Sequence, residues 1–172
     1  MPNHAFQLGA LEAPFRFAAA KSGSAPSAGL PNCTPFGPII ERELAACRRN
    51  GTSLVVLSIG LDGFESVGLR HGQVVEAQLL QAVWDRLRNH LRGSDLAVRV
   101  GNAEFGAVLR NAAGAAAALV DARLSHALSQ PYGIGTLEIV LKAWAGVAIY
   151  PQAGGTGEAL AAAAVQDLSA KR

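Results

Sequence analysis

The chain has 172 residues, half of them apolar, which is enough to bury one core and leaves no room for a second sizeable domain. Its net charge of +2 and pI near 8.8 come without any long run of Lys or Arg, which argues against nucleic acid as a partner. No stretch approaches about 18 uninterrupted apolar residues, and the N-terminus lacks the apolar segment of a secretion signal. We therefore expect a cytoplasmic protein without a membrane span.

The residues that most often hold metals or act as nucleophiles form no pattern here. Cys33 and Cys47 are the only cysteines, and their spacing fits neither a metal site nor a redox pair. Two such cysteines are typical of reduced thiols in a cytosolic protein. The four histidines are scattered and form no cluster with the cysteines. From these residues we expect no metal site and no cofactor.

A change of composition divides the chain near residue 29. Residues 1–29 are rich in Ala, Ser, Gly and Pro, which predicts a flexible leader, and residues 30–172 form the folded domain. The leader carries apolar residues at 6–11 and at 15–17, including Phe15 and Phe17, that are candidates for contacts with a partner or with the domain.

Hydrophobic periodicity predicts alternating helices and strands in the domain. In chain order we expect a helix over 38–49, a strand over 52–61, a helix over 73–92, hairpin strands over 96–100 and 104–109, a helix over 111–129, a strand over 137–150 and a helix over 157–171. A hairpin within an otherwise alternating series predicts an α/β (α+β) fold with a mixed, mostly antiparallel central sheet flanked by helices.

The hairpin Gly101-Asn102-Ala103-Glu104-Phe105 resembles the five-letter signature of the GGDEF family of diguanylate cyclases, with three letters matching. Further partial matches follow in the family's order, at residues 29–32, 57–64, 72–77, 146–151 and 170–171. The resemblance covers almost all of residues 29–172 and implies the nucleotide-cyclase-like fold.

The same resemblance implies that catalysis is lost. The family joins two GTP molecules with the help of two divalent cations, which acidic side chains must hold. Five functional positions of the family are changed here: the metal-ligand positions are Gly60 and Ala103, the guanine-reading positions are Gly68 and Ala77, and Asn102 replaces the second hairpin glycine. We therefore expect a degenerate domain that is not an enzyme, with no catalytic residue and no bound metal.

Three charged residues remain near the family's catalytic site. Asp62 and Glu104 have simpler interpretations as a helix N-cap and an edge-strand charge. Lys171 falls on the family's closing lysine, where it either meets a phosphate or is a solvated charge.

A second motif carries the residues that the family uses to bind its product, cyclic di-GMP. Arg92-Gly93-Ser94-Asp95 matches the inhibitory RxxD motif, five residues before the hairpin signature, and Arg123 falls where the family has a further arginine. Arginine forks match phosphates and the acceptor edge of guanine, and a carboxylate accepts from guanine N–H groups. The simpler interpretations are a helix-terminal Arg92, a turn at Asp95, and an Arg123 side chain that lies along its own helix.

Two functions of different classes follow from these residues. The first is a cyclic di-GMP receptor that binds through Arg92, Asp95 and Arg123 and signals by association with another protein or with itself. The alternative is a ligand-independent interaction or dimerisation module. A GTP pocket without turnover is a third possibility, disfavoured because Gly68 and Ala77 replace both guanine-reading side chains.

Overall fold

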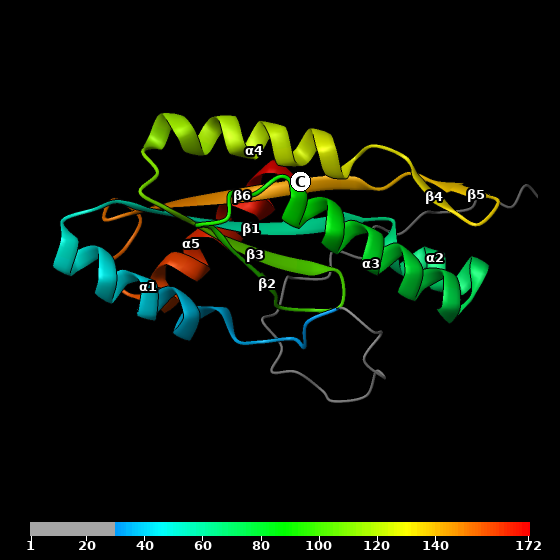
Figure 1. Cartoon of the computed structure of the whole chain (residues 1–172), viewed down its shortest axis with the longest axis horizontal. Coiled ribbons are helices and arrows are strands. Elements are labelled where there is room, and N and C mark those ends of the chain that lie inside the picture. The colour runs from blue at the N-terminus through cyan, green and yellow to red at the C-terminus, as the bar shows by residue number, and fades with distance from the viewer. Residues whose placement is uncertain (1–29) are drawn as a thin grey trace, which may run out of the picture.

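The computed structural model describes residues 30–172, so the predicted leader with Phe15 and Phe17 lies outside the described residues. The described helices and strands are α1 (Phe36–Asn50), β1 (Leu54–Asp62), α2 (Phe64–His71), α3 (Gln73–Asn89), β2 (Leu96–Arg99), β3 (Glu104–Arg110), α4 (Gly114–Leu128), β4 (Tyr132–Ile134), β5 (Leu137–Ile139), β6 (Lys142–Tyr150) and α5 (Gly157–Lys171) (Figure 1). None of the described helices is long and apolar enough to cross a membrane.

A four-stranded sheet with the order β2-β3-β1-β6 forms the centre of the domain, and each neighbouring pair is antiparallel. Strand β1 lies inside this sheet, with Gly60 opposite both Glu104 of β3 and Trp144 of β6. Strands β4 and β5 form a separate two-stranded hairpin. The expected α+β fold, with an antiparallel sheet flanked by helices, is confirmed.

The two faces of the sheet have separate cores because successive residues of a strand point to opposite faces. On β1, Val55 and Leu57 pack on the face covered by α2, α3 and α4, whereas Leu54 and Val56 pack against α1 and α5. All four side chains are fully buried. Because both faces of β1 are buried, its sequence is a continuous apolar run and not an alternating pattern.

Small residues allow α1 and α5 to approach the sheet closely. A Cβ atom added at Gly146 would lie 2.0 Å from the Ala164 carbonyl oxygen of α5. In the same cross-strand row, Ser58 lies between Gly146 and Gly106, and a Cβ at Gly106 would lie 2.5 Å from the Phe36 ring of α1. The glycine of the late-strand motif therefore has a packing role.

Four local features differ from the sequence-based expectation. Helix α2 was not among the elements predicted from periodicity, and the single strand expected over 137–150 is instead two strands that end and begin around Val140. Residues 137–139 pair with β4 through a turn in which Gly135 has φ +60°, so they leave the main sheet. Asn111 has φ 53°, which excludes it from a right-handed helix, and α4 starts at Gly114.

Candidate functional site

The signature hairpin is braced by its own neighbours. Arg99 donates from Nε to the Gly101 carbonyl oxygen at 3.1 Å and from Nη2 to Asn102 Oδ1 at 3.4 Å. The Phe105 ring is fully buried and stacks on Trp84 of α3, with 6.0 Å between ring centroids. The last letter of the signature is therefore a core residue, and the turn itself is held by an arginine outside the signature.

A carboxylate of this chain fills the space beside Gly68, one of the positions to which the resemblance assigns guanine recognition. A Cβ atom added at Gly68 would lie 2.0 Å from Glu76 Oε2. The other oxygen of Glu76 accepts a hydrogen bond from Asn102 Nδ2 at 3.5 Å. Glu76 thus links α3 to the hairpin and fills the position beside Gly68. The sequence offered no sign of this contact beyond an acidic residue where the family motif has glycine.

Asp62, at the end of β1, is not the helix N-cap that the sequence suggested. The N-cap of α2 is Gly63, and no side chain caps this helix. Asp62 Oδ2 accepts a hydrogen bond from Trp144 Nε1 at 2.8 Å, and Oδ1 pairs with Arg172 Nη2. Both carboxylate oxygens are therefore engaged within the domain.

Glu104 is not an edge-strand charge, because β3 lies between β2 and β1. Its side chain is half-buried, and its Oε2 lies over Gly101, 2.6 Å from the position of an added Cβ. Burial, followed by the nearby Glu65 charge, raises the pKa of Glu104 above its usual range. Because Glu104 is half-buried, its charged form is less stable than the charged form of a solvated glutamate.

Lys171 is neither a solvated charge nor directed to an open phosphate site. Its Nζ pairs with Asp121 at 2.8 Å and with Asp167 at 2.9 Å, and donates to the Ala145 carbonyl oxygen at 3.0 Å. Asp167 also accepts from the Val147 backbone N–H at 2.8 Å. These side chains satisfy backbone groups of β6 and join α4 to α5, so Lys171 has a structural role.

The residues at the catalytic positions do not fit a pair of divalent cations. Such cations need several oxygen ligands in defined geometry. Gly60 and Ala103 provide no side-chain oxygen, and Asp62 is committed to Trp144 and Arg172. Within residues 30–172, no three His, Cys, Asp or Glu side chains gather where they could hold a metal ion. No step of phosphoryl transfer can be assigned to this end of the domain.

The RxxD motif forms a tight turn between α3 and β2. The Asp95 backbone N–H donates to the Arg92 carbonyl oxygen at 3.0 Å, and the Arg92 backbone N–H donates to Asp95 Oδ2 at 3.0 Å. Asp95 therefore closes the turn. The Arg92 side chain is exposed, and its guanidinium makes no hydrogen bond or ion pair within the described part of the chain.

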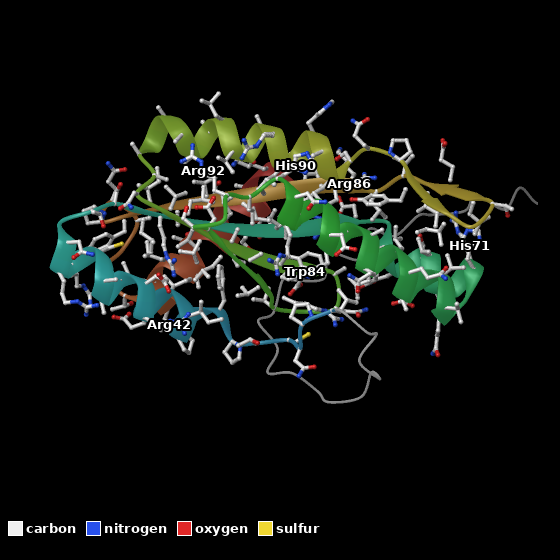
Figure 2. The ribbon with its side chains drawn as sticks, viewed as in Figure 1. Arg42, His71, Trp84, Arg86, His90 and Arg92 are labelled. Atoms are coloured by element: carbon white, nitrogen blue, oxygen red, sulfur yellow. The ribbon has the colours of Figure 1, made fainter. Side chains whose placement is uncertain are left out.

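Arg123 reaches this turn region from α4. Its Nη2 donates to the His90 carbonyl oxygen at 2.8 Å, two residues before Arg92. The His90 ring in turn bonds through Nδ1 to the Arg86 carbonyl oxygen at 2.8 Å. In Figure 2, His90 lies next to the α4 ribbon, which carries Arg123. The three RxxD-site residues thus come to one corner of the domain, where α3 ends, β2 begins and α4 passes.

Arg86, which the sequence analysis did not single out, fixes this corner. It donates to the carbonyl oxygens of Gln130 at 2.6 Å and Pro131 at 2.9 Å, just beyond the end of α4. Its guanidinium also lies 3.7 Å from the centroid of the Tyr132 ring. Burial raises the pKa of Tyr132 to about 12, so its hydroxyl stays neutral and donates to the Leu128 carbonyl oxygen. Arg86 therefore holds α3 against the end of the helix that carries Arg123.

Comparison with known proteins identifies the domain. Residues 26–172 match the family model described as diguanylate cyclase, GGDEF domain. The chain belongs to the GGDEF family. This is a cyclic di-GMP signalling family, and the relatives of this GGDEF domain carry names from that system.

Two relatives come from Pseudomonas aeruginosa. The cyclic di-GMP phosphodiesterase NbdA is 31% identical over 126 residues, which cover 73% of this chain and 16% of NbdA. The bifunctional diguanylate cyclase/cyclic di-GMP phosphodiesterase MucR is 32% identical over 127 residues, which cover 74% of this chain and 18% of MucR. The chain therefore spans less than a fifth of the length of either relative.

Solved structures confirm the fold of this GGDEF domain. The GGDEF domain of TpbB (YfiN) from Pseudomonas aeruginosa superposes with a TM-score of 0.76 at 28% identity, covering 83% of this chain and 89% of that one. A sensory box/GGDEF family protein from Caulobacter crescentus gives a TM-score of 0.73 at 29% identity, covering 78% and 88% of the two chains.

Proposed function

We propose that this GGDEF domain is catalytically inactive and acts as a cyclic di-GMP receptor through Arg92, Asp95 and Arg123, with signalling by protein association. The observation that carries the proposal is the contact between Arg123 and the His90 carbonyl oxygen, which brings an α4 arginine to the RxxD turn. Two guanidinium groups and one carboxylate, which can bind phosphates and guanine, are thereby brought to one corner of the domain.

The contacts of the side chains at the family's catalytic positions support the proposed loss of catalysis. Two cations and two GTP molecules require free acidic and amide groups. The remaining polar groups there bind one another instead: Glu76 binds Asn102, and Asp62 binds Trp144 and Arg172. A substrate would have to displace contacts that already satisfy these groups.

The charged side chains at the RxxD corner support the proposed receptor function. The exposed Arg92 guanidinium has no partner within residues 30–172, and one oxygen of Asp95 remains beside the one that closes the turn. A planar guanidinium stacks on bases and binds phosphates through paired N–H groups, and a carboxylate accepts from guanine. Cyclic di-GMP offers both guanine edges and phosphates. A solved relative of lower identity, the DgcB GGDEF domain of Caulobacter crescentus, is described in complex with cyclic di-GMP.

Calorimetric titration with cyclic di-GMP tests the receptor function. We expect binding by the wild-type protein and a fall in affinity of about tenfold or more in Arg92→Ala, since a charged hydrogen bond contributes roughly 1.5–3 kcal/mol. Arg70→Ala is the matched control, because it removes an exposed arginine from α2 near the catalytic end. No binding by the wild type, or equal affinity in Arg92→Ala, would refute the receptor function.

An activity assay tests the loss of catalysis separately. Purified protein incubated with GTP and Mg²⁺ or Mn²⁺ should yield no cyclic di-GMP. Clear turnover would overturn the inactive assignment and leave the binding result untouched.

The alternative, a ligand-independent interaction module, is favoured by apolar side chains that face solvent. Leu69 on α2 is 90% exposed and Val74 at the start of α3 is 72% exposed. Exposed apolar side chains mark a contact surface where they form a contiguous patch. If this function holds, Leu69→Ser with Val74→Ser abolishes association with a partner or with a second copy, and Arg92→Ala does not.

A further inference from the structure

A small cavity with opposite charges on its walls lies between α2 and the β4–β5 hairpin. It has a volume of about 230 Å³ and is lined by residues of α2, by Glu138 and Ile139 of β5, and by Val140, which follows β5. Figure 2 shows His71, one of the lining residues, at the end of α2 beside the hairpin. We call it the α2–β5 cavity.

The cavity lies on the face of α2 that is turned away from the space beside Gly68. Ser66, Val67 and Arg70 line it, and helical residues three or four apart lie on one face. A Cβ atom added at Gly68 would instead point to Glu76 of α3. The cavity is therefore separate from the positions to which the resemblance assigns guanine recognition, and no residue of the RxxD corner lines it.

Arg70 and Glu138 give the cavity one positive and one negative wall. Both side chains are exposed, so a ligand can reach them from solvent. They form no ion pair with each other, and neither has any other hydrogen bond or ion pair within residues 30–172. Opposite charges in contact across the cavity would close it. Because Arg70 and Glu138 stay apart, the space between them can hold a molecule that carries both charges.

Apolar side chains form the rest of the wall. Val67 and Ile139 are buried and belong to the main core, whereas Val140 is 63% exposed. A ligand with a small apolar group removes the Val140 side chain from water, which is favourable. Apolar walls also exclude water and strengthen the electrostatic interactions beside them. The cavity thus combines two opposite charges with a short apolar surface.

We propose that the α2–β5 cavity binds a small zwitterion, namely an α-amino acid with a short apolar side chain. The carboxylate of the ligand binds the Arg70 guanidinium, its ammonium group binds Glu138, and its side chain packs on Val67, Ile139 and Val140. Small-molecule sites run from roughly 300 Å³ upward. A cavity of about 230 Å³ is therefore too small for a nucleotide and suits a ligand of amino-acid size.

The bound amino acid links two parts of the domain. Strands β4 and β5 form a two-stranded sheet of their own, separate from the main sheet, and α2 lies across the cavity from β5. A ligand that binds the folded state stabilises it by mass action. The melting temperature should therefore rise with the amino-acid concentration. This inference does not rest on the proposed cyclic di-GMP receptor function.

NMR titration of the full chain with L-valine tests the proposal. Two analogues each lack one charge: 3-methylbutanoate has no ammonium group, and 2-methylpropylamine has no carboxylate. We expect L-valine to bind with shifts at α2 and β5, and each analogue to bind about tenfold or more weakly, because one charged hydrogen bond is lost.

Variants of the two charged walls should respond differently to the two analogues. Arg70→Gln should weaken binding of L-valine and 3-methylbutanoate about tenfold and leave that of 2-methylpropylamine unchanged. Glu138→Gln should weaken binding of L-valine and 2-methylpropylamine and leave that of 3-methylbutanoate unchanged. Neither side chain has a hydrogen bond or ion pair in the described part of the chain, so both variants should keep the wild-type melting temperature without ligand.

Two charge-matched controls separate this site from general electrostatics. Glu65→Gln removes an exposed charge from α2 outside the cavity lining, and Arg49→Gln removes one from α1. Both should leave the L-valine affinity unchanged. Absence of L-valine binding, equal affinity for all three compounds, or equal losses in Glu138→Gln and Glu65→Gln would each overturn the α2–β5 site. None of these results bears on cyclic di-GMP binding, which Arg92→Ala tests.

Discussion

The two ends of β2 differ in what their polar side chains do. At the hairpin end, Glu76, Asn102 and Arg99 bind one another and the turn. At the RxxD end, the backbone turn is closed by Asp95, but the Arg92 guanidinium has no partner within residues 30–172. Only the four residues Leu96–Arg99 of β2 separate the two regions. At one end the polar side chains bind one another, and at the other the Arg92 guanidinium keeps its donors unused within residues 30–172.

The difference shows that the catalytic positions of the family have changed by more than missing side chains. Gly60 and Ala103 remove ligands, whereas Glu76 adds a group that takes up the space beside Gly68. A pocket filled by a charged side chain is harder to reoccupy than one that is merely empty, because the ligand must replace an existing hydrogen bond. The RxxD corner shows no comparable filling.

The largest expected effect comes from removing both arginines of the RxxD corner. The double variant Arg92→Ala with Arg123→Ala should lower the affinity for cyclic di-GMP by about 100-fold or more, since two charged hydrogen bonds are lost at roughly 1.5–3 kcal/mol each. Titration calorimetry measures it. Asn102→Ala, at the other end of β2, should leave the affinity unchanged; a loss there equal to that of the double variant would contradict the contrast between the two ends.

A smaller change separates the two interpretations of Asp95. Asp95→Asn keeps a side-chain oxygen that can accept from the Arg92 backbone N–H, so the turn and the melting temperature should be preserved. It removes the charge and puts donors where guanine presents donors, so affinity for cyclic di-GMP should fall by about tenfold. Thermal melting and calorimetry on one preparation give both values. A lower melting temperature with unchanged affinity would make Asp95 a turn residue only.

At the hairpin end, Glu104 should limit stability in a pH-dependent way. Burial raises its pKa above the usual 4.5, so the folded state binds its proton more tightly than the unfolded state. The contribution of Glu104 is therefore most favourable below pH 4.5 and is lost as pH rises through the higher folded value. Glu104→Gln should raise the melting temperature at pH 7 by about 1–3 °C, and the gain should vanish near pH 4. Glu65→Gln, the matched control, should give a smaller gain; no gain at pH 7 in Glu104→Gln would contradict the assignment.

The sequence predicted the parts of the fold that depend on local periodicity. The long amphipathic helix of α3 and the buried run of β1 were found, because each has enough residues to show a repeat. Helix α2 and strand β4 are too short to show such a repeat and were not predicted from periodicity, and the residues of β5 were assigned to one long strand together with β6. The positive φ of Asn111, which shortens α4, also has no clear sequence sign.

The site was harder to predict because its contacts join distant parts of the chain. Asp62 and Trp144 are 82 residues apart, and Lys171 and Asp121 are 50 apart. Whether such a charge is free or paired depends on the packing of α4, α5 and β6, which no local pattern encodes. The RxxD motif could be found in the sequence because its residues form one local turn. The position of Arg123 beside His90 could not, because it depends on how Arg86 holds α3 to the end of α4.

The smallest expected effect concerns the filling of the space beside Gly68. Gly68→Asn restores the amide of the family, but its side chain must displace Glu76, whose oxygen lies where the new Cβ would go. Because the tip of Glu76 is flexible, the cost should be modest, and a double-mutant cycle with Glu76→Ala should give a coupling of about 0.5 kcal/mol. In this cycle, the intrinsic helix preferences of Gly and Asn cancel. Gln73→Ala, an exposed change on α3, is the control partner and should give additive effects. If thermal or urea melts show that the stability changes of Gly68→Asn and Glu76→Ala are additive, Glu76 does not obstruct this position. The space beside Gly68 would then be open to a ligand.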